Sequence, residues 1–279
     1  NIDLMAAAEG IIKIVNESMF GALRLVSVEQ GYDPRDFALV GFGGAGPLHA
    51  NALGILTDAW PVIIPPGPGV LCAYGDATTQ VQDEAARTYL TMASDLSDAK
   101  LAADLSELQT RASEALLKDN IPTSEHEITY QADLRYAGQA FQITIDFTED
   151  ELKKKGVALL TDQFDAEHEQ LFTFKLDDGH EVLMIRAVAK AKAKSIAERQ
   201  IGQTGMSLEE CKIIESRFYY EGDWYDANIY DRNKLNIGLE VAGPAIVGEM
   251  DSTTVILPGF VATVDAIGNL LINPVKRGK

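Results

Sequence analysis

Apolar residues recur at intervals of three and four near the N-terminus of this 279-residue chain. This spacing predicts one long helix over residues 6–30, with Gly31 in the position of a C-capping glycine. A second amphipathic helix is predicted over residues 95–118. A third begins after the N-cap residue Thr148 and runs, with a break at Gly156, to about residue 174. The helical pattern therefore lies in the first two thirds of the chain.

Between these helices the apolar residues form short runs or alternate with polar ones, which is typical of strands. Strands are expected at residues 37–42, 61–64, 81–92 and 181–191, and a hairpin over 128–147 that turns at residues 137–139. Beyond residue 207 nearly every segment has the strand pattern. We therefore expect an α/β fold with two parts, an α/β region over 1–192 and a β-rich domain over 208–279, joined by a charged linker.

The charge balance excludes some classes of partner. The chain has 24 Lys and Arg against 42 Asp and Glu, a net charge of −18, so neither nucleic acid nor an anionic membrane is expected as a direct partner. No apolar run approaches the roughly 20 residues that span a bilayer. Cys72 and Cys211 have no C-x-x-C spacing, which fits reduced thiols in a cytoplasmic protein. The neighbours of Cys72 are apolar, so we expect it to be a buried core residue.

The N-terminus does not resemble a natural start. It has no initiator methionine, no signal-peptide pattern, and it enters a helix almost at once. We therefore expect this sequence to be an internal piece of a longer protein.

Residues 41–46 carry the strongest functional signal. The apolar run 37–40 ends in four glycines, Gly41, Gly43, Gly44 and Gly46, and Pro47 opens a helix. Glycines admit close backbone approach, and the N–H groups of a helix start can bind an anion. A P-loop is excluded because no Lys follows the glycines. The G-x-G-x-x-G spacing is present, but the expected acidic residue does not end the next strand. A nucleotide-binding turn and a plain tight turn both remain open.

Other candidate residues have a structural explanation beside the functional one. His49 is three residues beyond the glycines and could contact a phosphate or a substrate oxygen, or simply pack. Arg135 and Gln139 flank the hairpin turn and could reach a substrate, although a well-paired hairpin explains them equally. The polar run 251–254 is explained equally well by turn capping. The other histidines, His126, His168 and His180, are scattered without metal-ligand spacing, so no metal is expected to be held by this chain alone.

Four motifs, in order along the chain, resemble the hydantoinase A / 5-oxoprolinase family. They are residues 27–50 around the glycines, residues 68–75 (Pro-Gly-Val-Leu-Cys-Ala-Tyr-Gly), residues 133–139 (Asp-Leu-Arg-Tyr-Ala-Gly-Gln), and the C-terminal stretch 242–260. The resemblance covers nearly the whole chain and is weakest at 193–217.

This resemblance implies a partial actin-like (ribonuclease H-like) ATPase lobe followed by the β-rich domain. Members of the family open cyclic amides with ATP and Mg²⁺, by phosphorylating a carbonyl oxygen, together with a hydantoinase B-type subunit or domain. The nucleotide-binding residues implied are Gly43, Gly44, Ala45 and Gly46, while His49, Arg135 and Gln139 are possible substrate or phosphate contacts. The catalytic residues are not identified.

The resemblance also implies what this sequence lacks. The Asp-bearing phosphate loops of the first actin-like lobe are absent, so we expect the isolated chain to bind ATP weakly and to be inactive. Two alternatives stay open: a subunit of a ketone (acetone or acetophenone) carboxylase, or a non-catalytic module that assembles the partner subunit.

Overall fold

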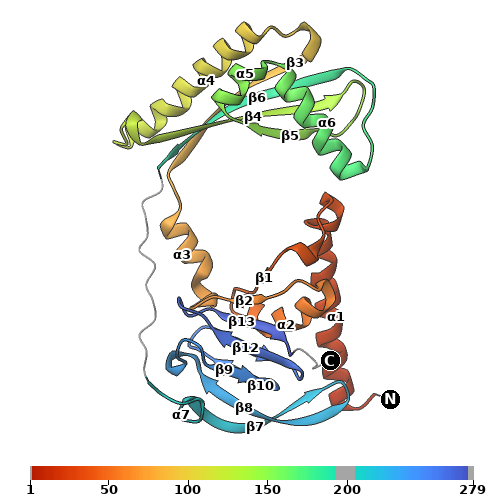
Figure 1. Ribbon diagram of the computed structural model, residues 1–279, viewed down its shortest axis with the longest axis vertical. Helices are drawn as coiled ribbons and strands as arrows, with labels where there is room; N and C mark the ends of the chain where they lie inside the picture. The colour runs from red at the N-terminus through yellow and green to blue at the C-terminus, as the bar shows by residue number, and fades with distance from the viewer. Residues whose placement is uncertain (1, 193–204, 276–279) are drawn as a thin grey trace. The chain divides into compact units, whose positions relative to one another are not determined.

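The computed structural model describes residues 2–192 and 205–275 (Figure 1). The chain forms two compact units. Unit 1 contains the described residues up to Thr78 and from Gly205 onward, and unit 2 contains Thr79 through Lys192. Both units combine helices with sheets, which confirms the α/β fold class.

Unit 2 is an antiparallel sheet of four strands with helices packed on it (Figure 1). The strand order is β3 (Gln82–Met92), β6 (His180–Ala191), β4 (His126–Tyr136) and β5 (Ile143–Phe147). The helices are α4 (Asp98–Lys118), α5 (Glu149–Lys155) and α6 (Ala158–Phe172). Helix α4 packs on β3 and β6, and α6 packs on β5 and β4. One continuous segment of the chain therefore builds this unit, although the paired strands β3 and β6 come from opposite ends of that segment.

The core of unit 2 follows directly from residue spacing. Leu101, Leu105 and Leu108 lie on one face of α4 and are at most 1% exposed. On the sheet, Ile145 and Phe147 alternate with exposed polar residues, so their side chains enter the same core. Thr148 caps α5 through a capping box, as its position in the sequence predicts.

Unit 1 contains two sheets. The five-stranded sheet has the order β1 (Leu39–Val40), β2 (Val62–Ile64), β13 (Leu270–Pro274), β12 (Phe260–Val264) and β9 (Glu240–Ala242). The four-stranded sheet has the order β11 (Thr253–Ile256), β10 (Ala245–Gly248), β8 (Asp223–Asp231) and β7 (Lys212–Tyr220). The helices are α1 (Leu4–Leu25), α2 (Gly46–Thr57), α3 (Leu71–Thr78) and the short α7 (Leu208–Cys211). Helix α2 packs on β11 and β2, and α1 packs on α2.

Strand pairing joins the two ends of the chain within unit 1. Strand β13 pairs antiparallel with β2, so Leu270 lies opposite Ile64. The hydrophobic pattern predicts one boundary, between 1–192 and 208–279, whereas the chain passes from unit 1 to unit 2 after Thr78 and returns to unit 1 before Gly205. Local periodicity shows where a strand lies but not which distant strand it pairs with.

Several element boundaries differ from those expected. The first helix ends at Leu25 and is followed by a separate short 3-10 turn, Val28–Gln30. The strand expected over 37–42 is only Leu39–Val40. Cys72 is exposed on α3, so the expectation that it is a buried core residue is wrong. Apolar sequence neighbours do not bury a residue unless another element packs against its helix.

Candidate functional site

The glycine loop, residues 41–46, connects β1 to α2 in unit 1. Gly43 has a φ of +84°, a conformation that favours glycine. A Cβ on Gly41 would lie 2.7 Å from the Ala50 Cβ. These two glycines are therefore required by backbone conformation and packing alone. Gly44 is different, because it is exposed and a Cβ there would make only an ordinary 3.6 Å contact with the Asp251 carbonyl oxygen. Its missing side chain leaves open space beside the loop.

Three loops far apart in the sequence meet at this point, and we call them the three-loop site: residues 41–46, 65–69 and 249–252. The Gly43 N–H donates to the Pro68 carbonyl oxygen at 2.7 Å, which joins the first two loops. The Ser252 hydroxyl donates to the Gly44 carbonyl oxygen at 3.2 Å, which joins the first and third. The site is thus a small framework held by hydrogen bonds to backbone groups of the first two loops.

The second and third loops are also held together by close approach and a hydrogen bond. The Gly67 N–H donates to Glu249 Oε2 at 3.2 Å. A Cβ on Gly69 would lie 2.6 Å from the Asp251 carbonyl oxygen, so only glycine fits there without movement. The proline–glycine motif is therefore explained by packing against residues 249–252, a partner that the sequence did not indicate.

The start of α2 offers backbone donors at the three-loop site. Its N-cap residue is Ala45, which has no side chain able to cap the helix, and Pro47 follows in the first turn. Pro47 has no N–H and the Leu48 N–H donates to the Ala45 carbonyl oxygen at 3.1 Å, so the N–H groups of Ala45 and Gly46 are the donors left at this end, where the helix dipole favours an anion. This end of α2 can therefore bind an anionic oxygen.

The third loop of the site, residues 249–252, contributes two carboxylates. Glu249 Oε1 and Asp251 Oδ2 are buried and have no hydrogen-bond partner among the described residues. Burial raises the pKa of Glu249, and the nearby Arg232 charge opposes this shift. Arg232 itself is 8% exposed and donates from Nη2 to the Ile64 and Gly268 carbonyl oxygens. Unpaired carboxylate oxygens attract N–H and O–H donors or a cation, and repel phosphate oxygens.

His49 is held in one orientation by Asn16, a residue that the sequence pattern does not single out. Its Nδ1 lies 2.8 Å from Oδ1 of Asn16 on α1. Because an amide oxygen only accepts, Nδ1 must carry the hydrogen. Burial lowers the His49 pKa, so the ring is neutral at pH 7 and Nε2 has a free lone pair. Such a nitrogen accepts a proton or a hydrogen bond, which argues against a phosphate contact. The sequence signal that could have indicated this contact is Asn16 itself, a polar residue that is buried on the face of α1 that packs on α2.

Arg135 and Gln139 lie in unit 2, whereas the glycine loop and His49 lie in unit 1. Arg135 Nε donates to Glu181 Oε2 at 2.7 Å across the β4–β6 pairing. Gln139 follows the turn, and its Oε1 is buried without a partner among the described residues. Arg135 thus already has a structural partner, while Gln139 retains an unused acceptor.

The motif residue between them, Tyr136, is the centre of a buried network. Its hydroxyl donates to Asp165 Oδ1 at 2.7 Å and accepts from the Leu176 N–H at 3.1 Å. His180 Nε2 contacts the same Asp165 oxygen at 2.7 Å, and the rings of His168 and His180 lie 4.9 and 5.1 Å from the Tyr136 ring. Histidines that are scattered in the sequence are therefore gathered by the fold around one tyrosine.

The described ranges, 2–192 and 205–275, contain neither a cluster of metal ligands nor a membrane-spanning helix. Within them no group of three or more His, Cys, Asp or Glu is placed to hold a metal ion. None of the helices in those ranges combines the length and apolar character needed to cross a membrane.

Comparison with known families identifies the chain. The hydantoinase/oxoprolinase model matches residues 1–85, and the hydantoinase/oxoprolinase C-terminal domain model matches residues 92–271. The chain belongs to the hydantoinase/oxoprolinase family. The resemblance inferred from the four motifs is thereby confirmed.

Relatives of this hydantoinase/oxoprolinase chain include both named enzymes and an unassigned protein. It is 35% identical to an uncharacterized protein of Methanocaldococcus jannaschii, over 95% of this chain and 37% of the relative. It is 26% identical to the caprolactamase subunit alpha of Pseudomonas jessenii, over 98% of this chain and 40% of the relative. It is 28% identical to the acetone carboxylase beta subunit of Xanthobacter autotrophicus, over 93% of this chain and 38% of the relative.

Two solved structures share the fold. The crystal structure of the ATP-dependent caprolactamase from Pseudomonas jessenii matches with a TM-score of 0.85 at 26% identity, over 96% of this chain and 40% of that one. A nucleotide-free acetone carboxylase matches with a TM-score of 0.64 at 24% identity and supports the fold alone. The chain thus spans about two fifths of the length of these relatives.

Proposed function

We propose that this chain is the C-terminal part of an ATP-dependent enzyme that opens cyclic amides, and that its glycine loop contacts the nucleotide. The observation that carries the proposal is the three-loop site, an open glycine loop at an uncapped helix start, in a chain similar to an ATP-dependent caprolactamase. ATP suits this chemistry, since phosphorylating the amide oxygen turns a poor leaving group into a good one. In this proposal unit 1 contains part of an actin-like lobe, and the β-rich segment 208–279 completes the C-terminal region.

Within the site we assign different ends of the nucleotide to different groups. The backbone N–H groups of Gly44, Ala45 and Gly46 at the start of α2 face phosphate oxygens. Gly43, whose N–H donates to the Pro68 carbonyl oxygen, contacts the nucleotide only through the close approach that a glycine allows. The unpaired oxygens of Glu249 and Asp251 accept hydrogen bonds from nucleoside N–H or O–H groups. Alternatively they help to hold the Mg²⁺ that accompanies ATP, because Mg²⁺ is usually bound by one or two carboxylates plus phosphates. The described residues supply no third ligand, so the chain alone is not proposed to hold the metal.

His49 fits a role as acceptor rather than as phosphate ligand. Its Nδ1–H is engaged by Asn16, and its neutral Nε2 can accept a hydrogen bond from a substrate N–H, a hydroxyl or a water molecule. Gln139, with its unused buried oxygen, and Arg135 are retained as possible substrate contacts in unit 2.

The proposal includes a second protein component. Two relatives are named as subunits, the caprolactamase subunit alpha and the acetone carboxylase beta subunit. We propose a hydantoinase B-type partner, a cytoplasmic location, and weak ATP binding with no turnover by the isolated chain, because it spans only about two fifths of its relatives.

A ketone carboxylase is the second candidate, supported by the 28% identity to the acetone carboxylase beta subunit. Both reactions activate an oxygen by phosphorylation, so the glycine loop does not separate them. Measuring ATP turnover of the full-length protein with its partner, first with hydantoins, 5-oxoproline and lactams and then with ketones plus bicarbonate, distinguishes the two.

A variant of Gly44 tests the nucleotide role against a purely structural module. Gly44→Leu places a side chain in the open space beside the loop, and Gly21→Leu on α1 is the matched control because a Cβ there meets nothing within 4 Å. Loss of ATPase in Gly44→Leu with partner assembly intact supports the nucleotide role. Unchanged ATPase in Gly44→Leu would favour the assembly module.

A further inference from the structure

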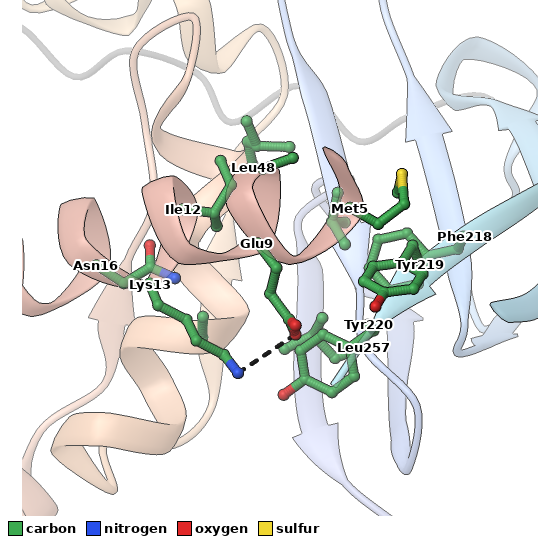
Figure 2. Close-up of a pocket in the computed structure, with 13 residues that line it drawn as sticks. Met5, Glu9, Ile12, Lys13, Asn16, Leu48, Phe218, Tyr219, Tyr220 and Leu257 are labelled. Atoms are coloured by element: carbon green, nitrogen blue, oxygen red, sulfur yellow. Dashed lines mark ion pairs between the residues drawn. The ribbon is translucent and has the colours of Figure 1, made fainter. Parts of the chain in front are cut away.

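A cavity that is separate from the three-loop site lies in unit 1 (Figure 2). It has a volume of about 230 Å³ and lies between α1, the first turns of α2, the end of β7 and strand β11. No residue of the three-loop site lines it. Its walls are mainly apolar side chains, namely Met5, Ala8, Ile12, Leu48, Ala52, Phe218, Val255 and Leu257.

The size of the cavity limits what can enter. An apolar cavity of about 150 Å³ accepts benzene, and pockets for drug-sized ligands begin at about 300 Å³. A volume of about 230 Å³ therefore fits a single ring that carries one small substituent.

One wall of the cavity carries an unused hydrogen-bond donor. Asn16 is only 8% exposed, and its Oδ1 is engaged by His49. Its Nδ2 has no hydrogen-bond partner among the described residues, and Figure 2 shows that nitrogen on the cavity side of the residue. An amide N–H in an apolar wall is stabilised by an acceptor, so the ligand should bring one.

The charges at the rim oppose an anionic ligand. Lys13 is paired with Glu9 at 3.3 Å, as the dashed line in Figure 2 marks, and Glu9 Oε1 also accepts from the Glu221 N–H at 2.6 Å. Burial, followed by the carboxylates of Glu221 and Glu9, raises the pKa of Tyr220 to about 12. The Lys13 charge is thus already compensated, and the remaining local charge is negative.

We propose that this cavity is a binding site for a small, neutral ring compound that carries a hydrogen-bond acceptor, which receives the Asn16 Nδ2–H. The site does not depend on the proposed reaction, since it shares no lining residue with the three-loop site. It does adjoin α2, because Leu48 lines it and the next residue, His49, is bonded to Asn16. A ligand here would therefore hold the α1–α2 contact in place.

Binding of three fluorinated probes to the full-length protein, followed by ¹⁹F NMR, tests the proposal. Methyl 4-fluorobenzoate is neutral with an acceptor, 1-ethyl-4-fluorobenzene lacks the acceptor, and 4-fluorobenzoate is the anion. We expect the ester to bind about tenfold more tightly than either analogue, the loss that one unmade hydrogen bond or one unfavourable charge produces. Absence of ester binding, or equal binding of the anion, would overturn the proposal.

Three variants locate the probe. Ala8→Phe fills the cavity with a ring and should abolish binding of the ester. Ile14→Phe, on the same helix at a 68% exposed position that does not line the cavity, should leave binding unchanged. Asn16→Asp removes the donor but keeps an acceptor for His49, and should weaken binding about tenfold. Circular dichroism shows that each variant is folded, and ester binding by folded Ala8→Phe at wild-type strength refutes the site.

Discussion

The Ser252 hydroxyl donates a hydrogen bond to the Gly44 carbonyl oxygen at 3.2 Å, across 208 residues of sequence. This contact fixes the exposed glycine of the first loop against the turn between β10 and β11. Within the polar run 251–254, Ser252 therefore does more than cap a local turn, because its hydroxyl binds a distant loop. The consequences of this arrangement can be measured, because both tryptophans, Trp60 and Trp224, lie in unit 1 and report on its unfolding.

Replacing Ser252 by Ala should loosen the glycine loop. The lost hydrogen bond should lower the free energy of unfolding of unit 1 by about 1 kcal/mol, and amide exchange at residues 43–46 should accelerate. Ser18→Ala is the control, since that hydroxyl bonds to Ile14 within its own exposed helix. Equal exchange rates at 43–46 in both variants would show that the Ser252 contact does not restrain the loop.

The two central glycines should respond differently to alanine. Gly43→Ala forces a side chain into a left-handed conformation and should cost about 1–2 kcal/mol of stability. Gly44→Ala makes only an ordinary contact at 3.6 Å and should change stability by less than about 0.5 kcal/mol. Urea unfolding followed by tryptophan fluorescence measures both. A larger loss of stability for Gly44→Ala than for Gly43→Ala would contradict the left-handed conformation of Gly43 and the open space at Gly44.

Glu249 should make the stability of unit 1 fall as pH rises. Its folded pKa is raised, mainly by burial, so the folded state binds the proton more tightly than the unfolded state. Its stabilising contribution is therefore present below its ordinary pKa of 4.5 and is lost as pH rises through the folded value. Glu249→Gln keeps an acceptor for the Gly67 N–H and should remove this dependence. The wild type should thus be less stable relative to Glu249→Gln at pH 7 than at pH 4.5, and an opposite slope contradicts the assignment.

His49 should titrate below the ordinary histidine value. Burial lowers its pKa from 6.5, so its neutral form stabilises the fold above pH 6.5 and that contribution is lost as pH falls through the folded pKa. NMR titration of the His49 ring measures the shift directly. Asn16→Asp places a carboxylate on Nδ1 and should raise the His49 pKa relative to wild type. An unchanged value in Asn16→Asp would mean that residue 16 does not orient the ring.

The Tyr136 hydroxyl should matter more than that of Tyr130, although both are buried in unit 2. Tyr136 bonds to Asp165 and to the Leu176 N–H, whereas Tyr130 bonds to Gln109 alone. Tyr136→Phe should therefore cost about 2 kcal/mol and Tyr130→Phe about 1 kcal/mol, because the first removes two hydrogen bonds and leaves the Leu176 N–H without its acceptor, while Asp165 keeps its contact with His180. Amide exchange across β4 and β6 measures both losses. Equal losses of stability in the two variants would show that the hydrogen bonds of the Tyr136 hydroxyl contribute no more than the single bond of Tyr130.

Local sequence patterns were enough to predict most helices and strands and the family that the chain belongs to. The spacing of Leu101, Leu105 and Leu108 predicts a helix, and Thr148 as an N-cap residue predicts where the next helix begins. The glycine run at 41–46 predicts a turn between a strand and a helix. These features depend on side chains a few residues apart, whose interactions a linear pattern contains.

The long-range partners of these segments became clear only from the folded chain. The sequence of β13 does not indicate that Leu270 lies opposite Ile64. Likewise, no local pattern indicates that Glu249 and Ser252 belong to the three-loop site. The fold also gave His49 its partner Asn16 and left Cys72 exposed despite its apolar neighbours. The physical reason is that pairing, burial and pKa depend on what packs against a residue in space, and strand and loop contacts spanning some 200 residues leave no periodic trace in the sequence.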